Sequence, residues 1–185
     1  MAFPLDEMID KVGFVHLHLH TSFSLREGAL PLAKLLKLAE ADGQPALAVT
    51  DTNNLFGALE FSEKLAKSGI QPIIGIQLAI AFGDGAQLSA RLGEDEAGRA
   101  PLVLLAQDEE GYLNLMHLAS RAWLDPTPGE PPHISFERLA GRSARLIALT
   151  GGPNGPLDVS LGVGRQEVAR ARLERLMPIF DRRLA

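Results

Sequence analysis

The sequence contains no cysteine, few aromatic residues and no long hydrophobic run. Without cysteine, the chain cannot be a small module held together by disulfides. A membrane-spanning helix needs roughly 18 consecutive apolar residues, and no stretch approaches that length. The aromatic residues, 5% of the total, lie scattered along the chain, which argues against a base-stacking surface for nucleic acid.

What is present is the composition of an ordinary globular domain. The 185 residues are 46% hydrophobic and 22% charged, which excludes a disordered chain. The first eleven residues carry three acids and one lysine, unlike a signal peptide. We therefore expect a soluble, cytoplasmic chain with no membrane partner, about one domain in size and large enough to bury a core.

The net charge of −5 hides an uneven distribution. Residues 138–185 hold nine arginines and four acids, whereas residues 1–137 hold nine basic and nineteen acidic residues. The basic end could be a flank for nucleic acid or an acidic partner. The solvated face of an amphipathic last helix is the more common explanation of such a charge run.

Strand-like and helix-like segments alternate along the chain. Apolar runs and period-two alternation predict strands at 14–19, 46–50, 72–81, 102–106 and 146–150. Helical spacing predicts helices at 31–42, 57–67, 110–123 and 166–177, and exposed loops at 83–100 and 125–132. This alternation indicates an α/β fold of parallel βα units. A closed barrel needs about eight strands, so we expect an incomplete barrel, truncated before its last strands.

Three histidines, His16, His18 and His20, alternate with leucines on the first predicted strand. Same-face side chains of a strand lie about 6.5–7 Å apart, so neighbouring imidazoles can converge on one Zn²⁺, Mn²⁺ or iron ion. Glu27, in the loop that follows, could add a carboxylate. The alternative is a polar strand face with buried, hydrogen-bonded histidines. Three imidazoles in one pattern favour metal ligation or a remnant of it.

Two further segments lie where the predicted strands end. Asp51 could orient a metal-binding imidazole from behind, or Asp51 or Asn53 could cap the next helix, and the spacing favours neither role. Residues 151–155, Gly-Gly-Pro-Asn-Gly, could cradle a phosphate. They lack the spacing of an established phosphate loop, so an ordinary turn is the better interpretation.

Five blocks of sequence, all in order, resemble the PHP (polymerase and histidinol phosphatase) domain family. The blocks are residues 14–28, 45–57, 69–75, 104–122 and 146–152. The chain is most similar to the N-terminal PHP domain of bacterial DNA polymerase III alpha subunits. The resemblance covers about residues 12–180, so we assign residues 1–185 to one PHP domain. It implies a distorted (β/α)7 barrel, here without its last strands and without the polymerase domains.

The resemblance also implies a candidate metal site. His18 and His20 match the His-x-His pair that metal-bearing members use in a three-metal centre, and Glu27 matches the acidic position before a glycine. Asp51 would lie behind these ligands, and His16 is not a usual ligand. Where metal-bearing members have His, Glu and His, this chain has Thr52, Gln77 and Pro101. We therefore expect a degenerate site, with at most residual Zn²⁺ or Mn²⁺.

The resemblance implies the function of a full-length polymerase III alpha subunit, of which this chain would be the N-terminal part. We call that full-length subunit the parent protein. It would extend a primer on DNA from dNTPs, with Mg²⁺ held by carboxylates outside these residues. The PHP domain would be a structural element that docks the proofreading exonuclease subunit and other polymerase III holoenzyme subunits, and this fragment would have neither polymerase nor phosphoesterase activity. Two alternatives remain at this point: a metal-dependent phosphoesterase of the PHP superfamily, and a module that only binds and stabilises.

Overall fold

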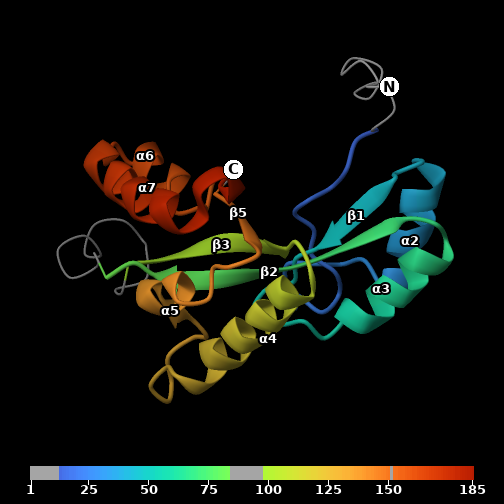
Figure 1. Cartoon of the computed structure of the whole chain (residues 1–185), viewed down its shortest axis with the longest axis horizontal. Coiled ribbons are helices and arrows are strands. Elements are labelled where there is room, and N and C mark those ends of the chain that lie inside the picture. The colour runs from blue at the N-terminus through green and yellow to red at the C-terminus, as the bar shows by residue number, and fades with distance from the viewer. Residues whose placement is uncertain (1–12, 84–97, 151) are drawn as a thin grey trace.

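The computed structural model describes residues 13–83, 98–150 and 152–185, which form one mixed five-stranded sheet flanked by helices (Figure 1). The strands are β1 (Ala46–Val49), β2 (Gln71–Ala81), β3 (Arg99–Ala106), β4 (Ile134–Ser135) and β5 (Leu146–Leu149). The helices are α2 (Leu32–Ala41), α3 (Ala58–Lys67), α4 (Glu109–Leu124), α5 (Phe136–Ala140), α6 (Asp158–Gly162), α7 (Gln166–Phe180) and the 3₁₀ turn η3 (Asp181–Arg183). Among these described helices, none combines the length and apolarity that crossing a bilayer requires.

The sheet is α/β in class, but its strand directions are mixed. The strand order is β1-β2-β3-β5, and β4 pairs with β2 outside this path. β1 and β2 are parallel, with α3 between them in the chain. β3 runs antiparallel to both β2 and β5, so the prediction of parallel units throughout is wrong. Between β3 and β5 the chain passes through α4, β4 and α5, a path long enough to enter the sheet from either end.

The sheet is also open within the described residues, with β1 and β5 at the ends of the strand order, so no closed barrel is present there. The expected truncation of a barrel stays a prediction. The helices are distributed around this open sheet: α2 and α3 lie beside β1 at one end, and α6 and α7 lie together at the other (Figure 1).

The predicted first strand at 14–19 is extended but irregular. The backbone N–H groups of Ala48 and Thr50 donate to the carbonyls of His16 and Leu19, each at 2.9 Å. Between these two bonds the N-terminal segment advances three residues, whereas β1 and the residue after it advance two, an offset like that of a β-bulge. The hydroxyl of Thr50 accepts the remaining bond, from the N–H of Leu19 at 2.8 Å. The segment thus lines β1 without forming a regular ladder, and the prediction of a strand is corrected.

Most other predicted elements are confirmed with small shifts of their ends. β3 begins at Arg99, so the last residues of the predicted loop at 83–100 belong to a strand. Residues 84–97 and the first twelve residues lie outside the described parts, as does Gly151. The sequence patterns missed β4, α5 and α6, each of five residues or fewer. Segments this short carry too few residues for a periodic pattern.

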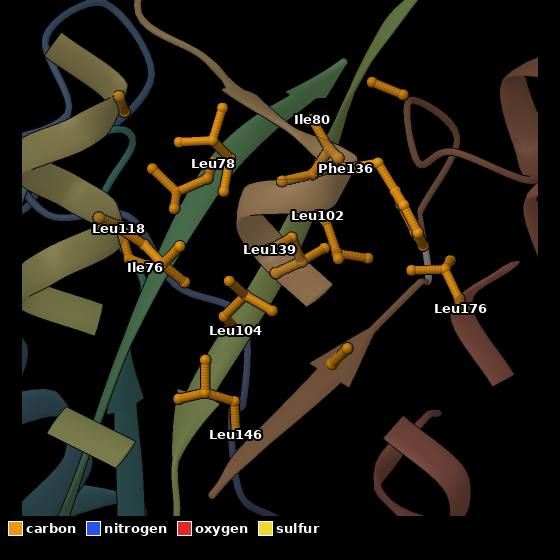
Figure 2. Close-up of a cluster of buried hydrophobic side chains, with 14 of the residues drawn as sticks. Ile76, Leu78, Ile80, Leu102, Leu104, Leu118, Phe136, Leu139, Leu146 and Leu176 are labelled. Atoms are coloured by element: carbon orange, nitrogen blue, oxygen red, sulfur yellow. The ribbon is translucent and has the colours of Figure 1, made fainter. Parts of the chain in front are cut away.

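The main hydrophobic core lies between the strands β2, β3 and β5 and the helices α4, α5 and α7 (Figure 2). A second cluster packs α2 and α3 against β1. Arg172 of α7 is fully buried, and its guanidinium donates to the carbonyl of Pro156 at 3.0 Å and stacks over the Phe82 ring. The arginine-rich end is therefore not only a solvated face, because at least one of its charges is a packing element.

Candidate functional site

The candidate site is built where β1 ends beside the middle of β2. Beyond Val49, the N–H of Gln77 donates to the carbonyl of Asp51 at 3.1 Å, and the N–H of Asn53 donates to the carbonyl of Gln77 at 2.9 Å. These bonds form an isolated parallel bridge between Thr52 and Gln77. The backbone thus holds both side chains at the same level of the sheet, facing the histidine segment.

Five side chains close a hydrogen-bonded ring at this place, hereafter the histidine ring. Its members are His18, His20, Glu27, Thr52 and Gln77. His18 Nε2 lies 3.0 Å from Gln77 Oε1 and 3.3 Å from His20 Nε2. Glu27 Oε2 lies 3.2 Å from His20 Nδ1 and accepts from the Thr52 hydroxyl at 2.5 Å. Gln77 Nε2 completes the ring by donating to Thr52 Oγ1 at 3.3 Å.

One assignment of protons satisfies every contact of the histidine ring. The amide oxygen of Gln77 can only accept, so His18 Nε2 carries the proton. The carboxylate of Glu27 also only accepts, so the proton of neutral His20 lies on Nδ1. His20 Nε2 then presents a lone pair, and the single N–H of His18 is shared between it and Gln77 Oε1. The ring is complete with one proton on His18 Nε2 and one on His20 Nδ1.

The electrostatics of His18 agree with this assignment. Burial, followed by the neighbouring His20, lowers the pKa of His18 below its usual 6.5, and the Gln77 hydrogen bond and Glu27 oppose the shift only in part. His18 is therefore neutral at pH 7, as its place in the ring requires.

Asp51 lies one layer behind the ring and organises the loop after His20. Its side chain is 2% exposed. It accepts from the N–H and hydroxyl of Thr21, each at 2.7 Å, and from the hydroxyl of Ser24 at 2.5 Å. Its hydrogen bonds in the described structure go to neither an imidazole nor the N-terminus of α3, whose N-cap is Gly57 without a side-chain bond. The carboxylate of Asp51 therefore acts on the histidine ring through the loop.

The ring borders a cavity of about 490 Å³. His18, His20, Glu27 and Gln77 line one side, and Pro101 and the turn at 152–155 line another. The N–H of Gly155 donates to the carbonyl of Gly152 at 2.8 Å, which is the hydrogen bond of an ordinary turn. The two candidate segments thus meet at one cavity. His16 does not belong to it and lines a separate hollow with Leu19, so the expectation of three imidazoles on one face is wrong for His16.

The residues present do not fit a three-metal centre. In the described parts of the chain, no group of three or more His, Asp and Glu side chains converges as metal ligands would. Glu27 contacts Nδ1 of His20, on the far side of the imidazole from Nε2. The remaining positions carry a neutral hydroxyl and a neutral amide, Thr52 and Gln77, which are bonded within the ring. We therefore derive no reaction step through a metal ion.

Sequence reasoning identified the ring members but not their arrangement. The resemblance marks Thr52 and Gln77 as positions where metal-bearing members of the family have ligands. Only the structure shows that Thr52 and Gln77 bond to each other, to His18 and to Glu27. The sequence offers one sign that Thr52 and Gln77 lie close together. Thr52 follows one predicted strand, and Gln77 lies within the next predicted strand.

The family of the chain follows from its match to known domains. The family model described as PHP domain matches residues 16–185, so the chain belongs to the PHP domain family. An amidohydrolase from Chromobacterium violaceum, solved with bound SO4 and no metal, superposes with a TM-score of 0.52 at 18% identity. The superposition covers 91% of this chain and 74% of that chain, and it supports a shared mixed α/β fold.

Two relatives from different bacteria carry the same description. DNA polymerase III subunit alpha of Caulobacter vibrioides is 40% identical over 173 residues, which is 92% of this chain and 14% of that protein. The same subunit of Thermus aquaticus is 41% identical over 178 residues, which is 95% of this chain and 14% of the relative. The predicted resemblance to the N-terminal region of these subunits is confirmed. The chain spans only about one seventh of their length.

Proposed function

We propose that these residues form a non-catalytic PHP domain of the alpha subunit of a replicative DNA polymerase III. The parent protein would act in the cytoplasm and add nucleotides from dNTPs to a primer on template DNA. The Mg²⁺ ions of such a reaction need carboxylates that hold the attacking and leaving oxygens, and these would lie outside the 185 residues. The 40% identity to polymerase III alpha subunits over nearly the whole chain supports this parentage.

The observation that carries the non-catalytic role is the closure of the histidine ring through Thr52 and Gln77. A cluster of carboxylates and imidazoles built for several cations would repel itself when empty. Here two neutral side chains stand in the cluster, and each ring donor has an acceptor within it. The ring therefore needs no cation, and it ties the loop before α2 to the ends of β1 and the middle of β2.

As a domain without chemistry of its own, the PHP domain would stabilise the polymerase subunit and dock the proofreading exonuclease subunit and other holoenzyme subunits. The resemblance to alpha subunits supports this role. A pull-down of the exonuclease subunit by the chain, compared with a pull-down by the same chain after heat denaturation, is the direct measurement.

The test of the non-catalytic role is a metal count combined with a turnover assay. We expect the purified chain to hold less than stoichiometric Zn²⁺ or Mn²⁺ and to keep its melting temperature in EDTA. We also expect no hydrolysis of p-nitrophenyl phosphate with either ion. As a comparison, the double variant Thr52→His, Gln77→Glu restores a metal-binding donor set and should gain metal in the same measurement. Tightly bound metal in the wild-type chain, with phosphatase turnover lost in His18→Ala, would overturn the proposal.

A metal-dependent phosphoesterase of the PHP superfamily is the second candidate, because both imidazoles border a cavity of about 490 Å³. The turn at 152–155 lines the same cavity, although the N–H of its Gly155 is already bonded to Gly152. This candidate requires at least one ion at His18 and His20, so the same metal count separates the two functions.

A further inference from the structure

The outer face of α4 carries an apolar surface with no partner among the described residues. Leu113, Met116, Trp123 and Leu124 lie on this helix, and Phe56 lies in the loop before α3. These five large side chains are between 37% and 76% exposed. Scattered exposed apolar residues are common, but several gathered around one helix indicate a binding surface. We call these five residues the α4 face.

A groove runs along one side of the α4 face. It has a volume of about 550 Å³ and lies between the loop at 53–56 and α4, with Tyr112, Met116 and Trp123 along the helix side. Its rim is already ordered: the indole N–H of Trp123 donates to the carbonyl of Asn53 at 2.7 Å. Asn54 Oδ1 accepts from the N–H of Phe56 at 3.2 Å. A partner would therefore meet a preformed groove and pay little for ordering it.

A group of basic side chains borders the other side of the α4 face. His117 and Arg121 lie on α4, and Arg138 and Arg142 lie in and just after α5. Burial, followed by the charges of Arg142, Arg121 and Arg138, lowers the pKa of His117, so all three arginines lie within electrostatic range of His117. Asp125 pairs with Arg121 at 3.2 Å and with Arg138 at 2.6 Å, which neutralises one of the positive charges. The border stays positive.

We propose that the α4 face and its groove dock a peptide segment of a partner protein that has apolar side chains for the groove and carboxylates for the basic border. The proposal rests on the docking role proposed above and adds the surface and the chemistry of the partner. The groove itself is lined by apolar and uncharged residues, so the segment must insert apolar side chains there. The positive charge lies on one border only, which selects acidic residues on that side of the segment.

The charges make two other occupants less suitable. The α4 face of a second copy consists of apolar side chains, so it would offer no carboxylate to Arg138 and Arg142. A nucleic acid would need basic groups along its whole path, whereas the groove side carries none. Binding of a second copy and binding of a nucleic acid are each a possible result of the peptide-binding experiment described next.

Trp123 is the only tryptophan of the chain, so its fluorescence reports directly on the groove. The probe is a synthetic 14-residue peptide without tryptophan, with leucines at helical spacing and glutamates at the other positions. A matched peptide replaces every glutamate by lysine. We expect a saturable blue shift of Trp123 emission with the acidic peptide, and binding roughly tenfold weaker or more with the basic peptide.

Variants then locate the surface. Leu124→Ser and the double variant Arg138→Glu, Arg142→Glu should each weaken the acidic peptide roughly tenfold. Leu161→Ser changes an exposed leucine of α6 and should leave binding unchanged. Circular dichroism and urea unfolding establish that each variant is folded.

Several results would overturn the proposal: no saturable shift up to about 1 mM peptide, equal binding of the two peptides, or an equal effect of Leu161→Ser. A blue shift with oligo-dT in place of the peptide would reassign the surface to nucleic acid. Concentration-dependent sedimentation abolished by Leu124→Ser would reassign it to self-association. If the exonuclease subunit binds the chain but Leu124→Ser does not weaken it, the surface is wrong while the docking role stands.

Discussion

The histidine ring and the α4 face are opposites in their chemistry. The ring is polar, and its five members find their hydrogen-bond partners in one another. The α4 face is apolar and exposes five large side chains to solvent. The ring carries the residues by which the family is recognised, yet its interactions are internally complete. The α4 face holds none of the candidate ligands, although Phe56, Leu113 and Met116 fall within two of the family blocks, and binding a partner would remove its apolar side chains from water.

The comparison teaches that a recognisable motif and a functional surface can separate. In the proposed function, the hydroxyl of Thr52 and the amide of Gln77 make the ring a structural link between the loop before α2 and the sheet. The α4 face is identified instead by the exposure of its apolar side chains and by the charges beside it. If the ring is structural and the α4 face is not, substitutions at the two regions should differ in their effect on stability.

The largest effect is expected from Asp51→Asn, behind the ring. The amide would place a donor against the N–H and hydroxyl of Thr21 or the hydroxyl of Ser24, all of which now donate to the carboxylate. We expect a loss of about 3 kcal/mol in the free energy of unfolding, because buried donors lose a charged acceptor. Urea unfolding measures it, with the exposed Glu63→Gln on α3 as the matched change. Equal stability of the two variants would contradict a structural role of Asp51.

A smaller effect is expected within the ring itself. Thr52→Val keeps the side-chain shape but removes the hydroxyl that bonds to Glu27 and Gln77. We expect a loss of about 1 kcal/mol in the free energy of unfolding. Ser120→Ala on α4, which removes a hydroxyl bonded only to the helix carbonyl of Met116, should cost less than about 0.5 kcal/mol. If Ser120→Ala costs more than Thr52→Val, the contrast between the two regions fails.

The smallest effect is the dependence of stability on pH that comes from His18. Since burial and His20 lower its pKa in the folded chain below 6.5, the folded state binds its proton less readily than the unfolded state. Its contribution to stability is therefore complete above about pH 6.5 and is lost as the pH falls through the folded-state pKa. We expect a loss below about 1 kcal/mol, because the side chain is partly exposed. Urea unfolding at pH 7.5 and 5.5 should show a smaller decrease in the free energy of unfolding for His18→Gln than for the wild-type chain. Equal decreases in the two proteins would contradict the lowered pKa of His18.

Local sequence determined much of this molecule. Apolar runs and helical spacing located four of the five strands that the structure assigns in its described residues, and all four long helices there, because each pattern is a property of neighbouring residues. The His-x-His motif and the acidic Glu27 placed the candidate site, and the replacements at Thr52 and Gln77 predicted that it is degenerate. These features depend on residue type and order, which the chain carries without folding.

Tertiary structure alone decided the rest. The antiparallel direction of β3 depends on how long connections return to the sheet, which no local pattern encodes. Glu27 faces Nδ1 rather than Nε2 of His20 because the loop held by Asp51 sets its approach. The α4 face exists because the core takes one side of that helix and nothing in the described chain covers the other. Each of these depends on contacts between residues far apart in the sequence, and such contacts form only when the sheet and its helices pack together.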